Sequence, residues 1–511
     1  MILHGDLETY CERPIGDGTY AYAEHAEIML FGYAIDDGPV LVWDWTADKR
    51  MPGDLEGCLH DTDCLLDFQN AMFDRTVFRL AANTTPLLRE VGNDIGRWRD
   101  TMVKALSHSL PGALAKTGAI MGLPEDEQKD KEGKQLIQLF CKPRPKNSLL
   151  RRATRFTHPT EWAKFKAYCA GDIISMRGVY NALPKWNYEG EELALWHLDQ
   201  KINDRGIHVD LDFARAAVAT AEKEKSRLAK RTVALTNDDV QRATQRDKLL
   251  GHILCEYGVD LPDLQASTLE RRINDPDLPI ELRELLDIRM QAAMGSSSKY
   301  KSLLKAASSD SRLRGLLQFC GANRTGRWAG RTFQPQNLFR PPVYIAESWE
   351  ESIATIRDGC ADLVFDNVME ATAACVRGAL IASPGHKLVV ADLSNIEGRD
   401  QAWLAGENWK LNAFAEFDAG RGVDAYILAY SKAFNVNPAN VTKYLRQIGK
   451  VMELMFGYEG GVGACLTGAL TYGFEVSELA ESVLPTLPAD IFDECRGFWD
   501  WTLKQRRNTF S

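Results

Sequence analysis

The sequence has no long apolar run, no CxxC cysteine pair and no positive net charge, and each absence argues against a class of protein. No stretch approaches the roughly 18 apolar residues of a membrane span, and the N-terminal segment MILHGDLETY lacks the basic and apolar regions of a secretory signal. The 11 cysteines are scattered, which is typical of reduced thiols rather than of a disulfide framework or a zinc site. We therefore expect a cytoplasmic protein that does not enter a membrane.

The charge balance argues against a protein that coats nucleic acid through overall positive charge, because the formal net charge is −10. It leaves room for an enzyme with acidic metal sites and local basic grooves, since phosphate binding depends on where lysines and arginines cluster. At 511 residues the chain is long enough for roughly three or four domains.

The chain changes character along its length. Up to about residue 186 it has an α/β pattern, with apolar runs at 27–35 and 39–45 that predict strands. Residues 65–78 and 162–183 have the length and spacing of helices. From about residue 192 to 314 the pattern is helical and rich in charge, and beyond residue 321 it returns to α/β.

A first group of acidic residues is spread over the α/β region. Asp6 and Glu8 alternate along a predicted strand and so share one face of it. Asp74 ends the run FQNAMFD, and Tyr168 and Asp172 are four apart, which places them on one side of a helix. Two neighbouring divalent ions need several shared carboxylates, and Mg²⁺ prefers such oxygen ligands. Each fragment alone is a weak signal, and only their order makes the set specific.

This order, D-x-E, then N-A-x-F-D, then Y-x-x-x-D, resembles the 3′–5′ exonuclease domain found beside many DNA polymerases, which has a ribonuclease H-like fold. The resemblance covers about the first 186 residues. It implies that Asp6, Glu8, Asp74 and Asp172 hold two Mg²⁺ ions, with Mn²⁺ as an alternative, and that Tyr168 orients the attacking water.

A second set of motifs lies in the C-terminal half. Residues 387–407, KLVVADLSNIEGRDQAWLAGE, contain an apolar run that predicts a strand ending at Asp392, and they resemble motif A of family A DNA polymerases. The resemblance implies that Asp392 binds both catalytic metals of polymerisation and that Glu397 packs under the incoming sugar and excludes a 2′-hydroxyl. The departures from the family's DYSQIELR are Leu393, Asn395 and Gly398.

A stripe of residues four apart follows Asn440, which is a candidate N-cap. Arg446, Lys450, Leu454 and Tyr458 would share one face of a helix, and this helix resembles motif B of the same family. The resemblance implies that Arg446 and Lys450 pair with the triphosphate and that Tyr458 stacks near the insertion site. Leu454 stands where the family often has an aromatic residue.

Two further segments resemble the same family. Residues 323–341 are similar to the segment that grips the primer–template, with Arg327 and Gln336 as the best-matched residues. Polar side chains suit the minor groove, whose acceptor positions are shared by all base pairs. Asp424-Ala-Tyr426 is a weaker match to a family D-x-H segment.

Together the motifs imply an α/β multidomain protein with a right-hand polymerase architecture. We expect an exonuclease domain at 1–186, a helical thumb at 187–320, the N-terminal part of the palm at 321–430 and the fingers at 431–511. The family's third motif, His-Asp-Glu on a palm hairpin, has no counterpart after Lys450. We therefore hypothesise a split polymerase whose remaining palm, with motif C, comes from a second polypeptide; a truncated gene would give the same sequence.

The predicted function is that of a viral, phage-type replicative DNA polymerase with proofreading, acting on a DNA primer–template and dNTPs in the host cytoplasm. A stand-alone 3′–5′ exonuclease and a non-catalytic DNA-binding scaffold remain as alternatives. The complete exonuclease set weighs against the scaffold, and Arg446, Lys450 and Tyr458 weigh against the stand-alone exonuclease. Glu397 and the exonuclease domain favour DNA over the RNA product of a single-subunit RNA polymerase.

Overall fold

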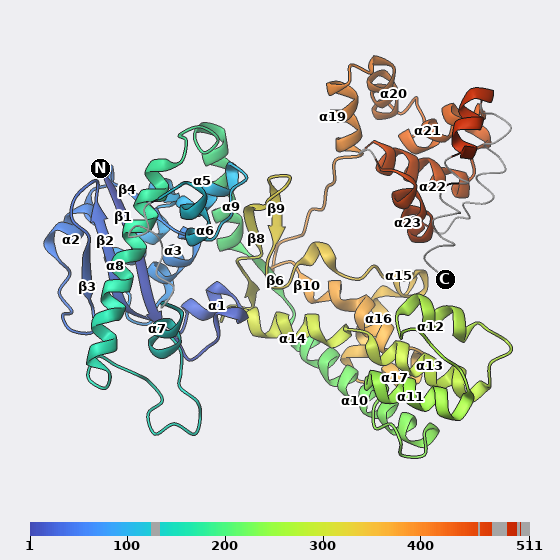
Figure 1. Cartoon of the computed structure of the whole chain (residues 1–511), viewed down its shortest axis with the longest axis horizontal. Helices are drawn as coiled ribbons and strands as arrows, with labels where there is room; N and C mark the ends of the chain where they lie inside the picture. Colours follow the sequence, from blue (N-terminus) through green and yellow to red (C-terminus); the bar gives the residue numbers. More distant parts are fainter. Residues whose placement is uncertain (124–132, 458–459, 473–487, 498–500, 502–511) are drawn as a thin grey trace. The chain divides into compact units, whose positions relative to one another are not determined.

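The computed structural model describes residues 1–123, 133–457, 460–472, 488–497 and 501, and the predicted mixture of helices and strands is confirmed. The chain divides into two compact units, Met1–Leu388 and Val389–Ser511. Figure 1 labels their helices and strands. Tyr458 lies outside the described residues. No helix in the described part of the chain is long and apolar enough to cross a bilayer.

The first unit begins with a mixed five-stranded sheet in the order β3-β2-β1-β4-β5. Strand β2 runs antiparallel to both β1 and β3, whereas β4 runs parallel to β1 and β5 parallel to β4. The strands are β1 Ile2–Tyr10, β2 Glu27–Ile35, β3 Leu41–Asp44, β4 Leu65–Phe68 and β5 Trp98–Asp100. The helix predicted over residues 65–78 is therefore wrong at its start. Residues 65–68 form a strand between β1 and β5, and its continuous apolar run fits a buried helix equally well.

Among the described residues, eight α-helices accompany this sheet, and one of them crosses it. They are α1 Thr19–Ala23, α2 Gly53–His60, α3 Ala71–Leu80, α4 Pro86–Asn93, α5 Thr101–Ser107, α6 Leu114–Ile120, α7 Gly133–Phe140 and α8 Pro159–Ala182. Helix α8 packs on β1 and β2 (Figure 1). The approach is close because Gly32 has no side chain: a Cβ there would lie 2.8 Å from Cys169 Sγ. The residues that α8 carries are thus held directly above β1.

The rest of the first unit is mainly helical, as the charge-rich pattern predicts for residues 192–314; the helices continue beyond residue 321, where an α/β pattern was predicted. Its elements up to the hairpin are α9 Gly190–Arg205, β6 Ile207–Val209, α10 Leu211–Leu235, α11 Arg246–Tyr257, α12 Ala266–Ile273, α13 Ile280–Ala293, α14 Ser296–Ala306, β7 Arg312–Leu313, β8 Leu317–Ala322 and β9 Arg327–Gly330. They are followed by α15 Val343–Glu347, α16 Trp349–Arg357, α17 Ala361–Val364, α18 Val368–Ala374 and β10 Leu380–Ile381. Helix α9 contributes Trp196, 1% exposed, to the core of the N-terminal sheet.

The second unit is helical in its described residues. Its helices are α19 Ile396–Leu404, α20 Asn408–Asp418, α21 Ala425–Phe434, α22 Lys443–Val451 and α23 Val462–Tyr472. Helix α22 begins after Thr442, whose side chain accepts the amide of Leu445 at 3.3 Å, so the N-cap predicted at Asn440 is wrong. Asn440 instead ends a 3₁₀ turn.

The strand predicted before Asp392 is also wrong. The segment from 382 to 395 has no regular structure, and Leu388, Val389 and Val390 are 55%, 81% and 92% exposed. No strand among the described residues pairs with this segment, so its backbone amides have no ladder to join. The sequence carries the apolar pattern of a strand, but a strand also requires a neighbour.

Candidate functional site

Three carboxylates converge where α8 crosses β1. Asp6 and Glu8 lie on β1, Asp172 lies on α8, and one oxygen of each is within 4.8 Å of the others. Glu8 and Asp172 are each 7% exposed, and Asp6 is half-buried. Carboxylate oxygens at this spacing suit Mg²⁺ or Mn²⁺, which bind hard oxygen ligands. The alternation of β1 and the close packing of α8 together produce the group.

Asp74 lies beside this group but outside it. It is on α3, is 2% exposed, and its Oδ1 accepts the amide of Leu7 at 3.1 Å, between the two acidic residues of β1. Burial and the neighbouring Asp6 carboxylate raise the pKa of Asp74. A cation bound at the group would favour the charged form of Asp74. The donor set therefore fits a divalent metal.

Tyr168 lies one helical turn before Asp172 and is 3% exposed. Its ring packs in parallel with that of Phe165 and closely against Gly133, where a side chain would collide with it. Burial, with the nearby Asp172 and Glu8 carboxylates, raises the pKa of the Tyr168 hydroxyl. The hydroxyl stays protonated and can donate a hydrogen bond.

Cys141 is a member of this site that sequence reasoning missed. Its thiol donates to Glu8 Oε2 at 3.5 Å, and burial, then Glu8, raises the pKa of the Cys141 thiol. The two residues are 133 positions apart, and no spacing signal connects them. A pocket of about 480 Å³ opens beside Glu8, and its walls include Thr9, Phe73 and Ile137.

The two residues predicted to contact the primer–template lie on the β8–β9 hairpin and on the 3₁₀ turn Pro335–Asn337 that follows it. Arg327 begins β9 and is exposed, while Gln336, also exposed, packs its amide against Gly330 at the other end of that strand. Strands β8 and β9 are antiparallel, with Ala322 opposite Arg327. Both exposed side chains thus belong to the first unit, Arg327 on the hairpin and Gln336 on the turn after it.

In the second unit, α22 and the start of α21 bring cations and an aromatic ring together. Arg446 Nε is 2.6 Å from Asp424 Oδ2, and Asp424 also caps α21 through the amides of Tyr426 and Ile427. The Tyr426 ring lies 5.0 Å from the Arg446 guanidinium and 5.9 Å from Lys450 Nζ. The Asp424-Ala-Tyr426 segment is therefore packed against the predicted triphosphate-binding residues.

The other predicted residues of this unit lie on other segments than α22 and the start of α21. Glu397 is half-buried in the first turn of α19, and Asp392 is exposed in the irregular segment. Leu454 is half-buried in a π-helical turn, Met452–Phe456, which follows α22. Because a π turn holds more residues than an α turn, the predicted spacing of four does not continue as one stripe through Leu454.

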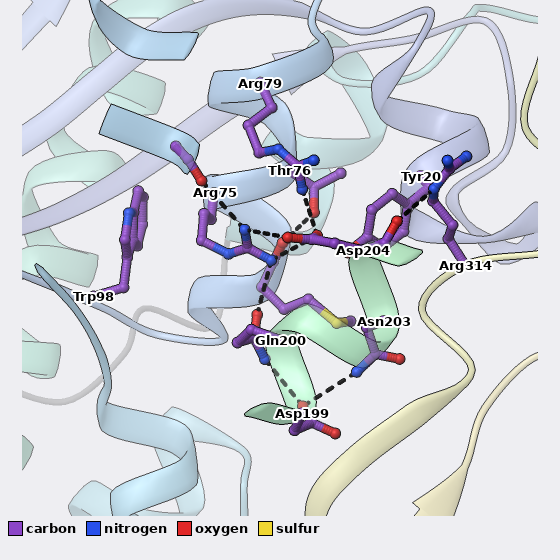
Figure 2. A network of polar contacts seen from close by, with 12 residues as sticks. Tyr20, Arg75, Thr76, Arg79, Trp98, Asp199, Gln200, Asn203, Asp204 and Arg314 are labelled. Carbon is purple, nitrogen blue, oxygen red and sulfur yellow. Dashed lines mark hydrogen bonds and ion pairs between the residues drawn. The ribbon is translucent and has the colours of Figure 1, made fainter. Parts of the chain in front are cut away.

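A polar network on α9, shown in Figure 2, was not predicted. Asp199 is 1% exposed and accepts three hydrogen bonds, from Trp328 Nε1 at 2.8 Å and from Gln200 and Asn203 at 3.1 Å. Asn203 also exchanges two hydrogen bonds with the backbone of Leu317, each 3.0 Å long. The C-terminal half of α9 therefore fixes the β8–β9 hairpin.

Asp199 is expected to make the chain less stable as the pH rises from about 4 to about 6. Burial raises the pKa of Asp199 from 3.8 to about 6, although its three hydrogen bonds and Arg75 favour the carboxylate. Between these values the unfolded chain has released the proton that the folded chain still holds, so stability falls with pH, by about 3 kcal/mol for this group. Thermal unfolding of Asp199→Asn and of the parent at pH 4.5 and 7.5 measures the effect, and the variant should gain relative to the parent at the higher pH.

Asp204, on the same helix, is a comparison group whose contribution to stability changes with pH in the opposite direction. Burial favours the protonated form of Asp204, but the hydrogen bonds and charge of Arg75, with Arg79, outweigh burial and hold the pKa of Asp204 below its ordinary value. Its stabilising effect is therefore present above the unfolded pKa and is lost in acid. A stability difference between Asp199→Asn and the parent that is the same at both pH values would contradict the assignment.

With this geometry established, comparisons with known proteins identify the class. The fold matches the solved polymerase domain of Pol1 from M. smegmatis, in complex with DNA primer-template and dNTP, with a TM-score of 0.51 at 16% identity. The match covers 99% of this chain and 75% of that one. The fold is thus that of a DNA polymerase domain. No family model matches the chain.

One relative is a phage DNA polymerase. The chain is 36% identical over 490 residues to the DNA polymerase of Bacillus phage SP02, covering 94% of this chain and 72% of that protein. The chain belongs to the family of this phage DNA polymerase and is a DNA polymerase. A shorter match, 33% identical over 129 residues, is to DNA polymerase I of Chloroflexus aurantiacus, covering 25% of this chain and 13% of that protein.

Proposed function

We propose that the chain is a family A replicative DNA polymerase of phage type, and that it also carries a proofreading 3′–5′ exonuclease. The observation that carries the exonuclease is the convergence of Asp6, Glu8 and Asp172 within 4.8 Å. The sheet order β3-β2-β1-β4-β5, with β4 and β5 on the parallel side, supports a ribonuclease H-like fold for this region. Membership of a polymerase family weighs against the non-catalytic scaffold.

In the proposed exonuclease reaction, Asp6, Glu8, Asp74 and Asp172 would hold two divalent metal ions. Such ions would lower the pKa of a water and offset negative charge on the scissile phosphate. Tyr168, whose hydroxyl stays protonated because of its burial, donates a hydrogen bond that orients the attacking water. The pocket beside Glu8 receives the 3′ end of a single strand.

In the proposed polymerase half, Arg327 and Gln336 contact the primer–template, and Arg446 and Lys450 bind the triphosphate of a dNTP. The support for the second pair is the cluster that they form with Tyr426. Triphosphate oxygens would replace Asp424 as the acceptor for Arg446, since a guanidinium binds phosphate and carboxylate with the same geometry. Tyr458 would stack near the insertion site, and Leu454 would lie near the nucleotide from the π-helical turn after α22. Asp392 would bind the polymerisation metals, and Glu397 would select the sugar.

The division into an exonuclease domain (1–186), a thumb (187–320), a palm (321–430) and fingers (431–511) is part of this proposal. Extension of a primer by this chain, lost in Asp392→Ala, would support the proposed polymerase site, and extension that Asp392→Ala leaves unchanged would overturn the role of Asp392.

The direction of degradation tests the exonuclease. The chain is incubated with Mg²⁺ and one oligonucleotide labelled at either its 5′ or its 3′ end. A 3′–5′ exonuclease converts the 5′-labelled strand to a ladder that shortens stepwise, and it releases the 3′ label at once as a mononucleotide. EDTA should stop both reactions. A 5′-labelled strand that keeps its full length in Mg²⁺ would overturn the proposed exonuclease.

A further inference from the structure

A buried arginine joins the helix that carries Asp74 to a helix far along the chain. Arg75, the next residue on α3, is fully buried, and its two terminal nitrogens each lie 2.8 Å from one oxygen of Asp204 on α9 (Figure 2). Gln200 Oε1 accepts a further hydrogen bond at 3.2 Å. This paired geometry fixes the orientation of the guanidinium as well as its charge.

Asp204 contacts other side chains besides Arg75. It also forms an ion pair with Arg79, one turn further along α3, and it accepts the hydroxyl of Tyr20 on α1 at 2.5 Å. The carboxylate is 16% exposed, so these contacts are largely shielded from water. The Asp204 side chain of α9 therefore contacts α3 at two residues, Arg75 and Arg79, which are one helical turn apart.

Two contacts one helical turn apart restrict the rotation of α3 about its own axis. Successive side chains on a helix are about 100° apart, so Asp74 faces β1 while Arg75 faces α9. The start of α3 is fixed separately, because Asp100 accepts the amides of Asn70 and Ala71 at 3.0 and 2.9 Å. Rotation of the helix about that anchor would move the Asp74 carboxylate relative to Asp6.

We propose that Asp204 is a positioning residue of the exonuclease site, which acts through Arg75 and Arg79 to hold Asp74 where it can bind metal. The inference rests on the exonuclease function proposed above. It adds to that function a determinant of metal binding that lies outside residues 1–186, on the helix that also fixes the β8–β9 hairpin.

The test compares Asp204→Asn with Asp210→Asn in the full chain. Asp210 is a matched control, because it is 18% exposed and pairs with Arg357 at 2.7 Å, away from α3. Single-turnover shortening of a labelled single strand is followed as Mg²⁺ is varied. We expect Asp204→Asn to slow shortening about 10- to 100-fold and to raise the Mg²⁺ concentration at half-maximal rate, as changes behind a metal ligand do. Asp210→Asn should leave both unchanged.

A second measurement and a second variant separate positioning from folding. Binding of Mn²⁺ to the chain without DNA, followed by the loss of the free-ion electron paramagnetic resonance signal, should weaken in Asp204→Asn and not in Asp210→Asn. Arg75→Lys keeps the charge but loses the paired geometry, so it should show the same metal dependence if Asp204→Asn does not fold. Mg²⁺ and Mn²⁺ dependence equal to the parent in the folded variant would overturn the proposal.

The outcomes also distinguish this proposal from the function on which it rests. A parent chain that shortens no DNA overturns the exonuclease, and weaker Mn²⁺ binding in Asp204→Asn would still support the positioning role. Shortening that Asp6→Ala removes, while Asp204→Asn behaves like Asp210→Asn, overturns the positioning role and leaves the exonuclease standing.

Discussion

Asp6→Ala is expected to slow the removal of 3′ nucleotides by about a thousandfold or more. Asp6 supplies one of the three carboxylates that lie within 4.8 Å, and its loss leaves Glu8 and Asp172 to hold the metal. Metal-based stabilisation of the reacting phosphate is worth several kcal/mol, and each 1.4 kcal/mol or so changes a rate tenfold. Single-turnover shortening of a 5′-labelled strand at saturating Mg²⁺ measures the effect.

Asp63→Ala is the matched control for this experiment. Asp63 is an exposed aspartate in the turn before β4, on the same domain but away from the three carboxylates. Its replacement should leave shortening at the parent rate. If Asp6→Ala retained that rate as well, the three carboxylates would not be the catalytic metal site, and nuclease activity would have to arise elsewhere.

Asp100→Ala is expected to lower the free energy of unfolding of the first unit by about 4 kcal/mol. Asp100 is 1% exposed, and its carboxylate accepts four backbone amides: Asn70 and Ala71 at the start of α3, and Met102 and Val103 at the start of α5. Each helix cap is worth about 1 kcal/mol, and buried amides left without an acceptor add about 1–3 kcal/mol. Denaturant unfolding at pH 5 measures the loss, because burial raises the pKa of Asp100 to about 7 and ionisation of the folded carboxyl at higher pH would offset the stabilisation.

Thr85→Ala shows how much the loss of a single helix cap lowers the free energy of unfolding, for comparison with Asp100→Ala. Thr85 accepts one amide, that of Leu88 at 3.2 Å, at the start of α4. Its replacement should lower the free energy of unfolding by about 1 kcal/mol. Equal losses in the two variants would mean that Asp100 serves one helix and not two.

Local periodicity predicted the parts of the site that depend on one element. Asp6 and Glu8 share a face because a strand alternates, and Tyr168 and Asp172 share a side because a helix repeats every 3.6 residues. The structure brings Asp6, Glu8 and Asp172 together by packing α8 on β1, a contact that the sequence expresses only through Gly32. No single-sequence pattern predicts such packing, which is why the resemblance was needed to join the motifs.

The unpredicted features depend on partners distant in the sequence. Arg75 and Asp204 are 129 residues apart, and on sequence alone each is an ordinary charged residue of a helix. The apolar run before Asp392 shows the reverse case, since a pattern typical of a strand forms none where no neighbour pairs with it. Pairing and burial, rather than propensity, decided both outcomes.

The position of α9 sets a limit on how this enzyme can exchange parts with its relatives during evolution. Recombination at residue 186 would separate the sheet from Trp196, which fills its core, and would leave Arg75 buried without the counter-charge of Asp204. Because Asp199 and Asn203 of α9 also bond Trp328 and Leu317, the segment that must be inherited as one block extends from Met1 through the β8–β9 hairpin, and viable crossovers should fall after Gly330.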